Sequence, residues 1–139
     1  MKAFIDTNVL IYWVDAGPRA DVVEQLLANY CVISVQVLNE FANVLGKKRA
    51  MALADIQELS NTLIDLCEVV DLSVHTHQTA LALMANYKLS LYDANIVAAA
   101  GLSTCTVLYS EDVQDGLNIK MPMSKNKKVL SIRNPFRVA

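Results

Sequence analysis

Four acidic residues, Asp6, Glu40, Asp93 and Asp112, stand at positions where carboxylates could meet and bind a metal ion. Asp6 follows a short apolar run that is typical of a buried strand, and Asp112 follows another. Glu40 and Asp93 lie in predicted helices that start at the same edge of the expected sheet. Four carboxylates gathered there repel one another and raise each other's pKa values unless a cation lies between them. Oxygen ligands without His or Cys favour Mg²⁺ or Mn²⁺.

Each of these residues also has a simpler explanation when it is taken alone. Asp6 could cap the helix that follows it, and Glu40 could be an ordinary residue at the boundary of a buried stripe. Ser90 and Asp93 have the spacing of a capping box, with Asp in place of the usual Glu or Gln. Acids after strands, such as Asp112, are common in turns. The metal site is the interpretation that explains the four acids together.

Short apolar runs alternate with helical patterns along the chain, and this order predicts the elements that carry the acids. Strands are expected at residues 3–5, 31–35, 67–72, 106–110 and 129–132, with helices at 9–13, 21–30, 35–45, 51–66, 76–87 and 90–100. Gly46 and Gly101 are expected to end two of the helices. The alternation predicts an α/β fold with a mainly parallel central sheet and helices on both faces.

The length and composition predict a single domain over residues 1–139. Hydrophobic residues make up 54% of the chain and charged residues 19%, which argues against a disordered chain. No apolar run approaches the roughly 18 residues that a membrane helix needs, and Asp6 interrupts the first run, so neither a membrane span nor a signal peptide is expected. Cys31, Cys67 and Cys105 lack the pairing of a disulfide framework or a zinc site. We therefore expect a cytoplasmic protein.

The net charge of −2 conceals a basic C-terminal segment that begins at about residue 120. That segment carries six basic residues and no acidic one, and Lys47, Lys48 and Arg49 form a second cluster. Such clusters can attract a polyanion. They can equally be a solvated tail and a helix C-terminus that suits the helix dipole. Both explanations stay open.

Four segments of the chain resemble the PIN-domain ribonucleases, and most of all the VapC-type toxins of bacterial toxin–antitoxin pairs. They are DTNVLIY (residues 6–12), SVQVLNEF (34–41), LYDANIVAAA (91–100) and LYSED (108–112). The resemblance extends from about residue 2 to residue 116, nearly the whole domain. Each segment is weak evidence alone, whereas four in the right order and spacing are specific. The family's fold is a three-layer sandwich of the kind that the alternating elements predict.

The resemblance implies roles for particular residues. Asp6 and Asp93 would be the primary ligands of Mg²⁺, with Mn²⁺ as a substitute. Glu40 and Asp112 would complete the site directly, through water or around a second ion. The hydroxyl groups that support this site would belong to Thr7 and Ser110.

The resemblance also implies a function. Members of the family cleave RNA, pair as homodimers and are silenced by an antitoxin protein. We therefore expect a metal-dependent endoribonuclease that leaves 5′-phosphate and 3′-hydroxyl ends and is the toxin of such a pair. Two alternatives stay open: an RNA-processing nuclease without an antitoxin, and a non-catalytic PIN-like module that binds RNA or protein. Residues 102–106 and the basic C-terminal segment depart from the family's pattern, so the RNA substrate stays open too.

Overall fold

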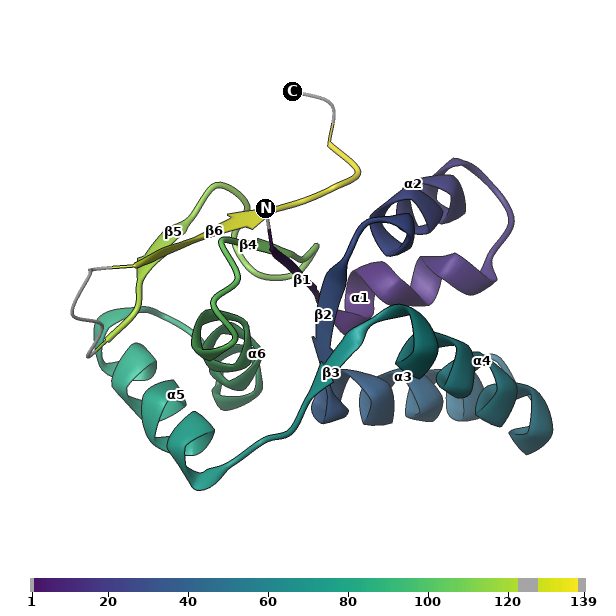
Figure 1. Ribbon diagram of the computed structural model, residues 1–139, viewed down its shortest axis with the longest axis horizontal. Helices are drawn as coiled ribbons and strands as arrows, with labels where there is room; N and C mark the ends of the chain where they lie inside the picture. Colours follow the sequence, from purple (N-terminus) through teal and green to yellow (C-terminus); the bar gives the residue numbers. More distant parts are fainter. Residues whose placement is uncertain (1, 123–127, 138–139) are drawn as a thin grey trace.

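A six-stranded sheet forms the centre of the computed structural model, which describes residues 2–122 and 128–137 (Figure 1). Its strands are Ala3–Ile5 (β1), Cys31–Ser34 (β2), Glu68–Val70 (β3), Val107–Tyr109 (β4), Asn118–Lys120 (β5) and Val129–Arg133 (β6). They lie in the order β3-β2-β1-β4-β6-β5. All neighbouring pairs are parallel except β5 and β6, which are antiparallel. The predicted mainly parallel sheet is thereby confirmed.

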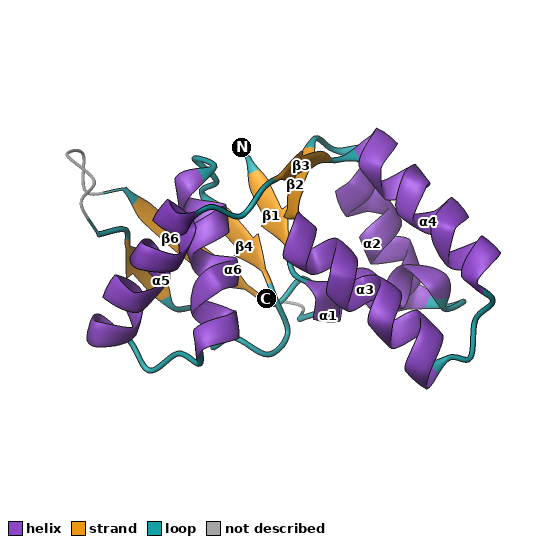
Figure 2. Cartoon of the chain, turned by 90° about the horizontal axis from the view of Figure 1, so that it is seen from below, coloured by secondary structure: helices purple, strands orange, loops and turns teal. Residues whose placement is uncertain are grey.

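Helices cover both faces of this sheet, as predicted. They are Thr7–Leu10 (α1), the 3₁₀ helix Ile11–Val14 (η1), Pro18–Ala28 (α2), Val35–Lys48 (α3), Leu53–Leu66 (α4), Val74–Asn86 (α5) and Leu91–Leu102 (α6). The pair α5 and α6 packs side by side on one face, and the helices α1 to α4 lie on the other (Figures 1 and 2). In the part of the chain that the structure describes, no helix combines the length and the apolar character that crossing a membrane requires.

The sheet core follows from the unbroken apolar strands of the sequence. Phe4, Ile33 and Leu108 are fully buried, as expected for strands with helices on both sides. Burying each such side chain stabilises the fold by roughly 1.5–3 kcal/mol. Along α6 the buried residues Ala98 and Ala100 are small, so their short side chains let this helix approach its neighbours closely.

Serine residues define where three of the helices begin. Ser34 Oγ accepts a hydrogen bond from Val37 N at 3.3 Å at the start of α3. Ser73 and Thr76 form a complete capping box at the start of α5. Ser90 caps α6. Because α3 and α6 start directly after these caps, their first turns lie at the edge of the sheet where the parallel strands end.

Two features of the fold differ from the sequence predictions. Strand β5 was not predicted, because three residues with one buried side chain are too short a pattern to detect. Gly46 and Gly101 do not end their helices but lie inside α3 and α6. At Gly101 a Cβ atom would collide with the side chain of Met121, so the glycine serves close packing. In the basic C-terminal segment, Lys125 and Lys127 lie outside the described residues, and Arg137 pairs with Asp115 at 3.4 Å.

Candidate functional site

Three hydrogen bonds hold the carboxylate of Asp6 at the carboxyl end of β1. Its Oδ1 atom accepts from Thr7 N at 2.7 Å, and its Oδ2 atom accepts from Ser110 Oγ at 2.9 Å and from Asn8 Nδ2 at 3.3 Å. The residue is only 5% exposed. Asp6 does cap α1, as its simpler explanation requires. The bond from Ser110 goes beyond a helix cap, because it joins the end of β1 to the end of β4.

Asn8 and Ser110 complete the hydrogen-bond network around Asp6. Asn8 Nδ2 donates to Ser110 Oγ at 3.2 Å, and Asn8 Oδ1 accepts from Glu111 N at 2.9 Å. Ser110 is fully buried, and its hydroxyl oxygen also accepts from Val113 N at 3.3 Å. A buried network in which each member has its partners holds its groups in one geometry. The position of the Asp6 carboxylate is therefore fixed by residues more than a hundred positions away in sequence.

The four acids predicted from the sequence line one cavity of about 350 Å³. Asp6 contributes from the end of β1, Glu40 from α3, Asp93 from the first turn of α6 and Asp112 from the loop after β4. Asp6 is buried, Glu40 and Asp93 are half-buried, and Asp112 is exposed. The strand ends and helix starts of the sheet edge thus meet in one cavity.

Burial raises the pKa of Asp6 from 3.8 to about 6, because the charged carboxylate has lost most of its water. The hydrogen bonds from Ser110 and Thr7 oppose this rise by stabilising the charged form. The charges of Glu40 and Asp93 add to the rise. These three carboxylates therefore lie near enough to repel one another, and a cation among them would reverse that effect.

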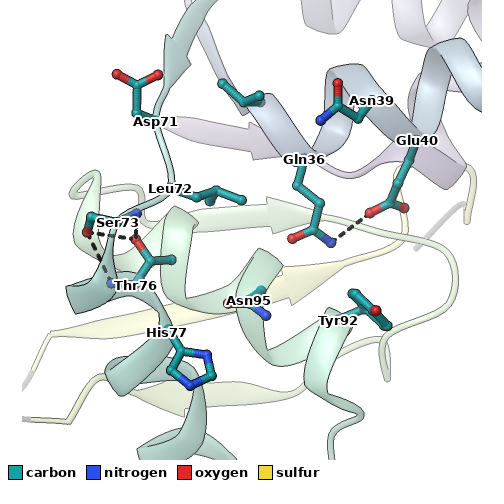
Figure 3. Close-up of a pocket in the computed structure, with 11 residues that line it drawn as sticks. Gln36, Asn39, Glu40, Asp71, Leu72, Ser73, Thr76, His77, Tyr92 and Asn95 are labelled. Carbon is teal, nitrogen blue, oxygen red and sulfur yellow. Dashed lines mark hydrogen bonds between the residues drawn. The ribbon is translucent and has the colours of Figure 1, made fainter.

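The two helix acids differ in how they are held. Glu40 Oε1 accepts a hydrogen bond from Gln36 Nε2 at 2.7 Å, one turn earlier on α3 (Figure 3). The backbone N–H of Asp93 donates to Ser90 Oγ at 3.1 Å, which is one half of a capping box. The other half is missing, since no donor in residues 2–122 and 128–137 reaches the Asp93 carboxylate. That carboxylate lines the cavity without serving as a cap.

Glu111 lines the same cavity as its neighbour Asp112, but its carboxylate is engaged elsewhere. Tyr12 Oη donates to Glu111 Oε1 at 2.9 Å, and Arg19 Nη1 lies 2.9 Å from Glu111 Oε2. The Arg19 guanidinium also lies 4.8 Å from the centre of the Tyr12 ring. Asp112 is therefore the acid of this pair whose carboxylate has no partner among the described residues.

The donor atoms in the cavity fit a hydrated Mg²⁺ ion. Thr7 Oγ1 is buried and has no hydrogen-bond partner among the described residues, so it can still bind a water or a ligand. Across those residues, no group of three or more Asp, Glu, His or Cys side chains is arranged to hold a metal ion by itself. Mg²⁺ usually keeps several waters and takes only one or two carboxylates. The residues present thus suit an ion that is bound partly through water.

Sequence reasoning missed several residues that line the cavity, among them Asn8, Gln36 and Lys48. Asn8 was identified only as part of the DTNVLIY segment, and its long-range bonds have no local signal. Lys48 was assigned to a basic cluster at a helix end. It lies four and eight residues after Val44 and Glu40, so a helical stripe that starts at Glu40 would have indicated it.

The chain matches the family model described as PIN domain over residues 3–114. A comparison with curated protein sequences gives no match. Among solved structures, VapC20 of Mycobacterium tuberculosis, described as a Sarcin-Ricin loop cleaving toxin, is 20% identical with a TM-score of 0.65, over 81% of this chain and 91% of the other.

Two further structures share the fold over almost the whole chain. A toxin–antitoxin complex from Klebsiella pneumoniae is 22% identical with a TM-score of 0.67, over 98% of this chain and 99% of the other. FitAcB from Neisseria gonorrhoeae is 14% identical with a TM-score of 0.71, over 98% and 99%. At these identities the likeness establishes the fold, and the predicted three-layer α/β architecture is confirmed.

Proposed function

Because the chain belongs to the PIN-domain family, we propose that it is an endoribonuclease that hydrolyses RNA phosphodiester bonds with Mg²⁺, or with Mn²⁺ in its place. The observation that carries this proposal is the single cavity lined by Asp6, Glu40, Asp93 and Asp112. Carboxylates around a Mg²⁺ ion and a substrate phosphate are a common arrangement in enzymes of phosphate chemistry.

The proposed ligands of the ion are Asp6 and Asp93, with Glu40 and Asp112 acting directly or through water. Bound there, Mg²⁺ would polarise the scissile phosphate and lower the pKa of a bound water toward neutrality. Gln36 holds the Glu40 carboxylate in one orientation through its hydrogen bond. Lys48 supplies a positive charge at the rim of the cavity, where it can pair with a phosphate oxygen of the RNA.

Ser110, Asn8 and Thr7 are the proposed positioning residues. Ser110 and Asn8 donate to Asp6 Oδ2 and leave Oδ1 with a single protein donor, Thr7 N. Oδ1 is therefore the atom of Asp6 that is better placed to bind an ion. The unpartnered Thr7 hydroxyl would hold a water beside it.

We further propose that the protein is the toxin of a toxin–antitoxin pair, acts in the cytoplasm and forms a homodimer. The Klebsiella pneumoniae structure of the same fold is a toxin–antitoxin complex. All three cysteines are free, in keeping with a reducing compartment. Apolar side chains are exposed on α4, where a second copy could cover them: Leu53, Ile64 and Leu66. Light scattering at tens of micromolar should give a dimer, and a monomer there would exclude this assembly.

Cleavage of a broad panel of single-stranded and hairpin RNAs tests the enzymatic proposal. The protein should cut RNA in Mg²⁺ or Mn²⁺, leave 5′-phosphate ends, and lose activity in EDTA and in the Asp6→Asn variant. Cleavage that persists in Asp6→Asn would come from a contaminating nuclease and would leave the proposal without support.

A non-catalytic binding module is the second candidate. It is favoured by the absence, among the described residues, of any three carboxylates arranged to hold an ion unaided. RNA binding without metal-dependent cleavage would decide for that candidate. Cleavage without a partner protein encoded beside the gene would favour an RNA-processing nuclease instead of a toxin.

A further inference from the structure

A second and larger cavity, of about 920 Å³, adjoins the acidic one. It lies between the first turns of α3, the segment that joins β3 to α5, and the starts of α5 and α6 (Figure 3). We call it the amide groove. Gln36, Glu40 and Tyr92 line both cavities, so the two spaces are continuous. A polymer held at the acidic cavity would therefore pass directly into the amide groove.

The charges that line the amide groove do not suit a phosphate. Among the described residues that line it, the ionised side chains are the acids Glu40 and Asp71, and none is Lys or Arg. The acidic cavity, in contrast, has Lys48 at its rim. A phosphate in the amide groove would meet negative charge without compensation. The groove suits an uncharged part of a nucleotide, which is the base.

The uncharged polar groups of the groove include three carboxamide side chains, those of Gln36, Asn39 and Asn95, beside Ser73, Thr76 and His77. Gln36 Nε2 donates to the Glu40 carboxylate at 2.7 Å, and Asn95 Nδ2 donates to Leu91 O at 3.1 Å. Both partners can only accept, so the orientation of each amide is determined and its carbonyl oxygen lies on the other side, as Figure 3 shows for Gln36. In the described part of the chain, the Asn39 carboxamide makes no hydrogen bond. Each of the three side chains therefore has a free carbonyl acceptor, and each NH₂ group also keeps at least one free N–H.

Tyr92 stands where the two cavities meet, and its side chain is 71% exposed. It is the aromatic residue best placed to stack on a base that leaves the acidic cavity. Stacking on aromatic side chains is how proteins usually hold unpaired RNA bases.

We propose that the amide groove is a base-recognition subsite for the unpaired nucleotide next to the scissile phosphate, and that it selects bases with an exocyclic amino group, adenine first, over uracil. This inference rests on the proposed function. An exocyclic amino group can donate to the free oxygens of Gln36 and Asn95, and a carboxamide such as that of Asn39 can pair with adenine N6 and N7 together. On the same edge uracil presents the carbonyl O4, which cannot donate to the oxygens of Gln36 and Asn95 as the adenine amino group can.

Binding of uncharged nucleosides tests the subsite without any need for cleavage. Adenosine and uridine are titrated into the metal-free protein in EDTA while the side-chain NH₂ signals of Gln36, Asn39 and Asn95 are followed by NMR. Adenosine should shift these signals and bind about tenfold or more tightly than uridine, since one well-placed base contact is worth about that factor. Equal binding of both nucleosides, or no shift with either, would overturn the proposal.

Two matched pairs of variants locate the effect. Tyr92→Ala should weaken adenosine binding about 5- to 100-fold, the usual range for a lost stacking partner. Tyr30→Ala removes a tyrosine of similar exposure, 62%, outside the groove and should leave binding unchanged. Asn95→Ala should reduce the preference for adenosine. Its match is Asn29→Ala, because Asn29 Nδ2 donates to Gln25 O at the same 3.1 Å at the C-terminal end of α2, outside the groove.

Cleavage of RNA oligonucleotides that differ by one A→U change beside the cut site separates this inference from the proposed function. Wild-type protein should cut the A-containing RNA faster, and Asn95→Ala should reduce that preference. If adenosine binds in the groove but no RNA is cut, the subsite stands and the nuclease proposal fails. If RNA is cut but neither the nucleoside titration nor the A→U change shows a preference, the nuclease stands and the subsite fails. If Tyr92→Ala dissociates a dimer and nucleosides do not bind, the groove is an interface between copies of this chain, which also overturns the subsite.

Discussion

Asp6 and Asp71 have similar sequence surroundings but lie in different environments in the folded protein. Each follows a three-residue strand and precedes a helix that starts within a few residues. Asp6 is 5% exposed and accepts three hydrogen bonds, whereas Asp71 is exposed and accepts none within the described residues. The difference comes from the order of the strands. β1 lies between β2 and β4, while β3 lies at an edge of the sheet.

This comparison shows that an acid at a strand end becomes a buried site only when a neighbouring strand supplies its partners. Ser110, at the end of β4, provides the hydroxyl that Asp6 needs. In parallel sheets the strand order is set by long-range packing, so the local pattern cannot reveal which strand end will acquire such a neighbour. We therefore expect the two acids to respond very differently to the same substitution.

The largest expected difference is in nuclease activity. Asp6→Asn should lower the rate of RNA cleavage by about 10³-fold or more, because it removes a proposed ligand of an ion that is worth several kcal/mol in the transition state. Asp71→Asn changes only the far end of the amide groove and should alter the rate by less than about tenfold. Single-turnover cleavage of one labelled RNA measures both. Similar losses in the two variants would mean that Asp6 has no special role.

The second expected effect concerns Ser110, the hydrogen-bond partner that Asp6 has at the end of β1 and that Asp71 lacks at the end of β3. Ser110→Ala removes a hydrogen bond that orients Asp6 and stabilises its charged form. It should weaken Mn²⁺ binding about 10- to 100-fold, the usual cost of losing a group that supports a metal ligand. Ser131→Ala, in which a hydroxyl on the adjacent strand β6 is removed, should leave Mn²⁺ affinity unchanged. Calorimetric titration compares the two, and equal affinities would exclude a positioning role for Ser110.

A smaller effect is expected in the pH dependence of stability. The pKa of Asp6 is about 6 in the folded protein and 3.8 without the fold, so the folded state binds this proton more tightly. The contribution of Asp6 to the stability of the folded protein is therefore most favourable at low pH and is lost as the pH rises through about 6. Between pH 4.5 and pH 7.5 this loss amounts to about 2 kcal/mol.

Urea unfolding in EDTA at these two pH values measures this loss. Relative to the wild type, Asp6→Asn should gain about 2 kcal/mol of unfolding free energy between pH 4.5 and pH 7.5, since Asn cannot ionise. Asp71→Asn should show no such gain. If the unfolding free energies of the wild type and of Asp6→Asn changed in parallel with pH, the fold would not raise the pKa of Asp6.

The sequence predicted the parts of the fold and site that have local signals. Strand β1 and the acids Asp6 and Asp93 could be found because apolar runs and helical spacing are read from neighbouring residues. The placement of Gly101 inside α6 could not be found, because it depends on Met121 packing from a distant loop. The same limit applies to Asn8, whose partners Ser110 and Glu111 are about a hundred residues away.

The central claim is that the acids at this sheet edge form a metal site, and Asp93 tests it most directly because helix capping could also explain its position. Thermal unfolding of the wild type and Asp93→Asn is measured in EDTA and again in Mn²⁺. In a cluster of repelling carboxylates, Asp93→Asn should unfold at the same or a higher temperature in EDTA. The stabilisation by Mn²⁺, which follows RT ln(1 + [L]/Kd), should shrink or vanish. A variant that is less stable in EDTA by up to about 1 kcal/mol and keeps the full Mn²⁺ stabilisation would show that Asp93 only stabilises the start of its helix, and would contradict the site.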